Sequence, residues 1–114
     1  MTNMRIERDC LGEMEIPNDR YYGIQTIRNM KVSGAAGFPV VAYPDMHKAL
    51  CQIKKACAKA NAEIGAMKPE IAQAIAAACG KVIAGGYEKE FPLDMWQGGG
   101  YTCVNMNVNE VIGN

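Results

Sequence analysis

The sequence predicts a mainly α-helical fold with an irregular N-terminal arm. Two observations indicate the helices: residues 45–64 place apolar side chains along one helical stripe, and residues 69–84 repeat the pattern between a proline and a glycine pair. A third observation indicates the arm, because residues 1–43 show no sustained helical or strand period. We therefore expect an arm, a helical hairpin over residues 44–86 and a final segment over residues 87–114.

The arm is predicted to contain short strands or turns. Glycine and proline interrupt it at Gly12, Pro17, Gly23, Gly34 and Gly37. Tyr21, Tyr22 and Ile24 are expected to pack against the helical hairpin, because a large apolar surface left in water would promote association.

The first helix of the hairpin is predicted over residues 45–64. Its apolar stripe alternates spacings of three and four and consists of Leu50, Ile53, Cys57, Ala60 and Ile64. Asp45 is a candidate N-cap, and Gly65 is a candidate stop.

The second helix is predicted over residues 69–84, with Pro69 suited to its start and Gly85 beyond its end. Gly80 lies inside the pattern and costs about 1 kcal/mol relative to alanine, so a bend or break is expected there. The short link favours antiparallel packing of the two helices. The side chains expected at their interface are Leu50, Ile53, Cys57, Ile71, Ile75 and Val82.

A third helix is predicted to begin after the glycine-rich loop, with Val104, Val108 and Val111 on one side. The sequence then stops at Asn114 without a helix cap or breaker. From this we expect the amino-terminal piece of a larger protein.

Length and charge exclude several classes of protein. The chain has 114 residues, enough for a single domain, and its 12 basic residues balance 12 acidic ones. No net field draws it to nucleic acid or to an anionic membrane. Its charged start does not resemble a secretory signal, and no apolar run is long enough to span a bilayer. A cytoplasmic protein with neither nucleic-acid nor membrane partners is expected.

The sequence has 5 cysteines, without a CxxC pair, and 1 histidine, which disfavours zinc sites and disulfide frameworks. The cysteines in the alanine-rich helical stretches are expected to be small buried hydrophobic residues. His47 is expected to be partly exposed at a helix start and to have no catalytic role.

The glycine-rich loop before the third helix is the candidate binding site. Three glycines, Gly98, Gly99 and Gly100, allow close approach of the backbone to a ligand, and Thr102 is expected to cap the helix. The N–H groups at a helix start favour an anion. A carboxylate fits better than a phosphate because the GK[ST] ending of a P-loop is absent. Taken alone, such a loop is also compatible with a purely structural turn.

Residues 97–111 read QGGGYTCVNMNVNEV. This run closely resembles the first shared motif of the aspartase and class II fumarase superfamily, approximately QGGAGTSxNMNxNEV in aspartases. The matching positions are Gln97, Gly98, Gly99, Thr102, Asn105, Met106, Asn107, Asn109, Glu110 and Val111. The resemblance extends to the run YYGIQTIR at residues 21–28 and favours aspartases over fumarases. The sequence differs from the family pattern at Gly100, Tyr101 and Cys103 and over residues 30–43.

The resemblance implies a homotetramer whose active sites form where three subunits meet. It implies reversible conversion of L-aspartate to fumarate and ammonium without an organic cofactor, with divalent metal activation left open. By position, Thr102 would bind a substrate carboxylate, assisted by Asn105 and the backbone of Gly98, Gly99 and Gly100. Asn107 and Asn109 would orient the loop.

The same resemblance places the general base outside this sequence, so no catalytic residue is assigned and the chain alone is expected to be inactive. Two alternatives stay open. One is a class II fumarase or another dicarboxylate lyase of the superfamily, and the other is a small helical interaction module without catalysis.

Overall fold

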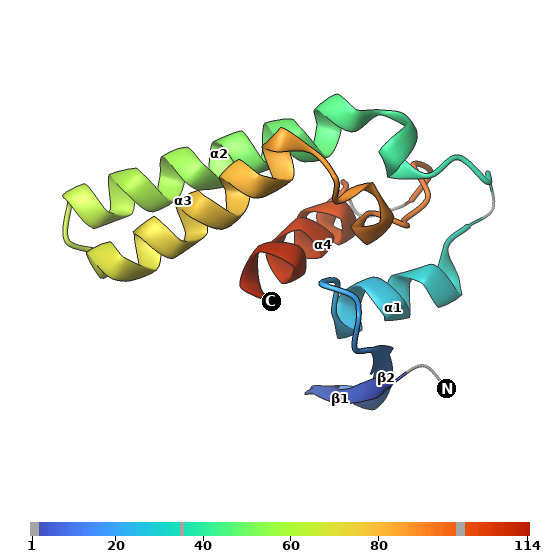
Figure 1. Ribbon diagram of the computed structural model, residues 1–114. Coiled ribbons are helices and arrows are strands. Elements are labelled where there is room, and N and C mark those ends of the chain that lie inside the picture. The colour runs from blue at the N-terminus through green and yellow to red at the C-terminus, as the bar shows by residue number, and fades with distance from the viewer. Residues whose placement is uncertain (1–2, 35, 98–99) are drawn as a thin grey trace.

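The computed structural model describes residues 3–34, 36–97 and 100–114 of the chain, and they form a mainly helical fold. Figure 1 shows two long antiparallel helices, α2 and α3, projecting to one side, with α4 between this pair and α1. A small β-hairpin lies below α1. Of the helices that the structure describes, none has the length and apolar character needed to cross a membrane.

The N-terminal arm begins with the β-hairpin of β1 (Met4–Asp9) and β2 (Gly12–Pro17). The strands are antiparallel, and Gly12 allows the tight turn because its φ of +115° is easily adopted only by glycine. The Asp9 carboxylate accepts a hydrogen bond from the Leu11 N–H at 2.9 Å and closes this turn. These are short strands of the kind that the sequence predicted.

The prediction of an irregular arm is wrong over α1 (Ile24–Val32). The N-cap, Gly23, has no side chain with which to cap the helix, and the first turn contains no acidic residue. The backbone donors of that turn are bound instead by carboxylates far along the chain, among them Glu110. A signal in a distant residue is invisible to local pattern analysis.

The two long helices are α2 (Pro44–Glu63) and α3 (Pro69–Ala84), close to the predicted ranges. Gly65, with φ of +77°, ends α2 as expected, but the N-cap of α2 is Tyr43 and not Asp45. Asp45 lies in the first turn after Pro44. No break occurs at Gly80, and α3 continues through it.

The predicted interface between α2 and α3 is only half correct. Val82 is buried and Leu50 and Ile75 are half-buried against the core, whereas Ile53 is 59% exposed and Ile71 is 48% exposed. Cys57 is also exposed, as are Ala60 and Ile64, the last two residues of the predicted apolar stripe. Besides Val82 and His47, the two helices bury only small side chains, which are Cys51, Ala58, Ala72 and Cys79. Small side chains allow two helices to approach closely, so the buried face is set by size and not by hydrophobicity alone.

The last helix, α4 (Thr102–Gly113), carries the centre of the core. Val104, Val108 and Val111 are buried, as predicted. Tyr22 and Ile24 of the arm are buried in one cluster with Cys51, Cys79 and Val82 of the hairpin and with Val108 and Val111 of α4, so the predicted packing of the arm on the hairpin is confirmed for these two residues. Tyr21 is 45% exposed, with its ring centroid 5.8 Å from that of Tyr87.

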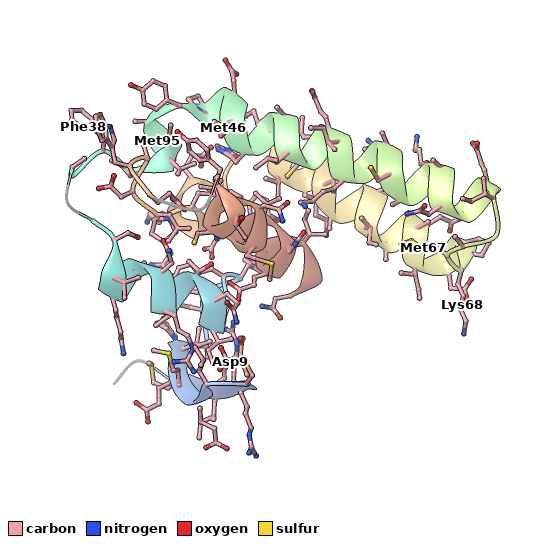
Figure 2. The ribbon with its side chains drawn as sticks, turned by 180° about the vertical axis from the view of Figure 1, so that it is seen from behind. Asp9, Phe38, Met46, Met67, Lys68 and Met95 are labelled. Atoms are coloured by element: carbon pink, nitrogen blue, oxygen red, sulfur yellow. The ribbon has the colours of Figure 1, made fainter. Side chains whose placement is uncertain are left out.

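A second, smaller core cluster lies under the start of α4. Val40, Leu93 and Val104 form it, and Met46 and Met95 pack against it. Figure 2 places Phe38, Met46 and Met95 together at one corner of the molecule.

Candidate functional site

The glycine-rich loop enters α4 through a left-handed turn. Gly100 has φ of +60°, and Tyr101 follows with φ of 63° and ψ of 18°, the one described non-glycine residue with a positive φ. Tyr101 is the N-cap and Thr102 is the first helical residue, so the prediction that Thr102 caps the helix is wrong. A left-handed residue followed by a helical one turns successive N–H groups toward one concave side, a shape that binds anions.

The predicted site residues are partly brought together. Thr102 is exposed at the N-terminus of α4, two residues after the exposed Gly100 and directly after Tyr101. Asn105 follows one turn along the helix, half-buried, and its side-chain Oδ1 accepts a hydrogen bond from Lys54 Nζ at 2.6 Å. Gly98 and Gly99 lie outside the described residues. The contact with Lys54 was not foreseen.

Asn107 and Asn109, predicted to orient the loop, differ in their surroundings. Asn107 is 1% exposed, and its Nδ2 donates to the main-chain carbonyl of Glu90 at 2.8 Å, which ties α4 to the segment before the loop. Asn109 is exposed, and its Nδ2 contacts Met106 Sδ at 3.5 Å.

Asp94 joins residues 36–37 to the start of the loop and was not predicted from the sequence. Its buried carboxylate accepts hydrogen bonds from the N–H groups of Gly37 at 2.8 Å and Trp96 at 2.7 Å. These main-chain donors hold the pKa of Asp94 below its usual value. The Gln97 side chain also donates to the Asp94 carbonyl at 2.5 Å. The segment that fits the family motif poorly therefore helps to hold the start of the loop.

Glu110 of α4 holds the start of α1. Its carboxylate accepts four hydrogen bonds of 2.6–3.1 Å, which come from Gly23 N, Gln25 N, Thr26 N and Thr26 Oγ1. A fifth hydrogen bond at this helix start is donated by Ile24 N to the Glu7 carboxylate at 2.9 Å. The positive end of the α1 dipole is therefore already neutralised from within the chain. In contrast, the first turn of α4 has no acidic residue.

His47 is buried, with 2% exposure, and the prediction that it is partly exposed is wrong. Its ring stacks on that of Phe91 with centroids 4.3 Å apart, and its Nδ1 has no hydrogen-bond partner among the described residues. Burial lowers the pKa of His47, so the neutral imidazole is favoured. His47 therefore packs in the core as an aromatic side chain.

The cysteines follow the expectation in part. Cys51 and Cys79 are buried on facing helices, and burial raises the pKa of Cys51 to about 12, which makes its thiol unreactive. Cys57 is exposed. Cys103, beside Thr102, has its sulfur 2.8 Å from the Asn29 amide nitrogen. Across residues 3–34, 36–97 and 100–114, no group of three or more histidine, cysteine or acidic side chains is placed to hold a metal ion.

The structure is a helical fold in which a left-handed turn leads into an asparagine-rich helix, and the N–H groups at such a helix start favour an anion. The profile described as lyase matches residues 12–114, and the chain belongs to this family.

Curated relatives carry the name aspartate ammonia-lyase. The Pseudomonas aeruginosa protein is 43% identical over 114 residues, which are 100% of this chain and 24% of the relative. A Bacillus protein is 46% identical over 116 residues, covering 99% of this chain and 24% of the relative. The Escherichia coli K12 protein is 41% identical over 113 residues, which cover 98% of this chain and 24% of the relative. The chain therefore spans about a quarter of the length of these relatives.

Solved structures share the fold. A Brucella melitensis protein described as fumarate lyase:delta crystallin, bound to cobalt, has a TM-score of 0.95 and 40% identity, covering 98% of this chain and 24% of that one. The class II fumarase of Schistosoma mansoni has a TM-score of 0.85 and 35% identity, and the match covers 96% of this chain and 23% of that one. The fold class predicted from the sequence is thereby confirmed.

Proposed function

We propose that this chain is part of an aspartate ammonia-lyase, which converts L-aspartate reversibly to fumarate and ammonium. The single observation that carries the proposal is the left-handed turn at Tyr101, which leads into α4 at the exposed Thr102. The names and identities of the relatives support the choice of substrate. Because the relatives are about four times longer, the activity is proposed for the complete protein that contains these residues.

The proposed mechanism uses the N-terminus of α4 to hold one substrate carboxylate. Thr102 would donate a hydrogen bond from its hydroxyl group to this carboxylate, and the main-chain N–H groups of the turn would add further donors. Removal of a Cβ proton from aspartate converts this carboxylate to an aci-carboxylate with additional negative charge. Donors already in place stabilise that charge more than the ground state and so lower the barrier. The general base belongs to residues outside this chain.

A test of Thr102 uses the complete protein. Thr102→Val removes the hydroxyl with little change in volume, and we expect kcat/KM for L-aspartate to fall by about 10²-fold, as for loss of one oxyanion donor. Thr102→Ser retains the hydroxyl and should recover most of the activity. Equal kinetics in Thr102→Val and the unaltered protein would remove Thr102 from the site.

A class II fumarase is the second candidate, favoured by the likeness to the Schistosoma mansoni enzyme. The same purified protein separates the two activities. Ammonium release from aspartate with rising fumarate absorbance supports the ammonia-lyase, whereas conversion of fumarate to malate supports the fumarase.

We propose further that the complete protein is a cytoplasmic homotetramer that needs no organic cofactor, and that the 114-residue chain alone is inactive. Light scattering measures the subunit number. Assays after dialysis against a chelator, with and without added Mg²⁺, establish whether a divalent metal activates the enzyme. Ammonia release by the purified 114-residue chain would contradict the placement of the base outside it.

A further inference from the structure

One contact joins the long helix α2 to the proposed substrate-binding helix α4. Lys54 Nζ donates to Asn105 Oδ1 at 2.6 Å, across a sequence separation of 51 residues. Both side chains are half-buried. Within the described parts of the chain, Lys54 forms no salt bridge, whereas Arg5, Arg20 and Arg28 all pair with carboxylates. The Lys54 ammonium is therefore committed to an amide oxygen and not to an acid.

The chemistry of this pair fixes the orientation of the Asn105 amide. An ammonium group has three donors and no acceptor, so only the amide oxygen can face it. The Nδ2 group, with its two donors, must then face the other way. Without Lys54 the amide could turn over by 180° and present its oxygen in place of its nitrogen. An oxygen would repel a substrate carboxylate that the nitrogen attracts.

We propose that Lys54 is a positioning residue for substrate binding: it holds Asn105 with its amide donors available to a dicarboxylate. The inference rests on the proposed function, because Asn105 assists carboxylate binding there. The backbone of Asn105 is held by the helix, since its N–H donates to the Tyr101 carbonyl at 3.1 Å. Lys54 acts on the side chain itself and sets the direction of its amide.

The test measures the KM for L-aspartate and the calorimetric Kd for succinate, a dicarboxylate that lacks the amino group, on the complete protein. Lys54→Met should raise both by about tenfold, the effect of losing one charge-assisted hydrogen bond, with a smaller change in kcat. Lys54→Arg, again a pure donor, should recover most of the affinity. Lys54→Gln should not, because glutamine can accept as well as donate. Lys55→Met is the control, since the neighbouring lysine makes no described hydrogen bond to α4.

A double-mutant cycle separates positioning from a general loss of structure. In an Asn105→Ala background, Lys54→Met should have no further effect on KM or Kd, because its action passes through Asn105. A full tenfold effect in that background would overturn the inference, as would equal values for Lys54→Met and Lys55→Met. Absence of lyase activity in the unaltered protein would overturn the proposed function, while the succinate Kd would still report on Lys54. Absence of succinate binding would overturn both.

Discussion

The N-terminal arm and the α2–α3 hairpin are held together by different kinds of interaction. The arm is fixed by charged groups within it and beyond it: its own Arg5 donates to three main-chain carbonyls, and the distant Glu90 and Glu110 accept from most of the main-chain N–H groups between residues 21 and 26. In the hairpin the helices face each other through small side chains such as Ala58 and Ala72. One region therefore depends on a few strong hydrogen bonds, and the other on close approach of two helices.

This difference makes the two regions sensitive to different changes. Loss of one carboxylate should loosen the whole start of α1, because that carboxylate satisfies several donors at once. No single side chain has this importance in the hairpin, where many small contacts share the stabilisation.

The largest effect is expected from Glu110→Gln, which removes the charge from the acceptor of four hydrogen bonds. We expect the free energy of unfolding to fall by about 3 kcal/mol, measured by urea unfolding of the 114-residue chain. Glu15→Gln, at an exposed position of β2, is the control and should change it little. A change below about 1 kcal/mol in Glu110→Gln would mean that the arm is not held by this carboxylate.

The same substitution should have opposite signs in the two regions. A Cβ at Gly23 would lie 2.7 Å from Glu7 Oε2 and 2.9 Å from the Glu110 carboxyl group, so Gly23→Ala should destabilise by about 2 kcal/mol. A Cβ at Gly80 would meet only Lys55 Nζ, at 3.9 Å, so Gly80→Ala should stabilise α3 by about 1 kcal/mol. Thermal unfolding of the two variants checks both signs. Destabilisation by both would show that α3 is as tightly constrained as the arm.

A smaller, pH-dependent effect is expected in the hairpin. The pKa of His47 lies below 6.5 in the folded chain, so the unfolded chain binds its proton first as the pH falls. Its contribution to stability is present above 6.5 and is lost as the pH falls toward the folded-state pKa. The nearby charges are Lys48, Glu88 and Asp45.

His47→Phe keeps an aromatic ring against Phe91 without the titrating group. Unfolding free energies at about pH 7.5 and about pH 5.5 should differ less in this variant than in the unaltered chain. Because His47 is the one histidine of the sequence, an unchanged pH dependence would assign the effect to carboxylates instead.

The helices could be predicted where the signal lies in neighbouring residues. Pro69 and Gly85 bound α3 at the expected places, and the valines of α4 face the core. The buried face of α2 could not be predicted from hydrophobicity, because Cys51 and Ala58 are chosen for size while Ile53 stays exposed. Such a choice depends on how near the partner helix lies.

The candidate site shows the same division. Thr102 could be placed from the motif and the glycines, and the structure puts it at the start of α4. The contacts around the site could not be predicted, because they join residues that are remote in sequence: Lys54 contacts Asn105, and Asp94 accepts a hydrogen bond from Gly37. The residue type of Tyr101 gave no sign of its left-handed backbone, because glycine or asparagine is the usual choice there, and the one sign was the glycine at this position of the family motif.

The carboxylates that fix the arm have a consequence for the order of events during synthesis. The ribosome completes residues 20–26 long before it reaches Glu90 and Glu110, whose carboxylates bind them across separations of 68–87 residues. Formation of long-range contacts must wait until both partners have emerged. This early segment is therefore joined to α4 only after Glu110 has emerged, and a nascent chain stalled before residue 110 would expose Tyr22 and Ile24 to other chains or to chaperones.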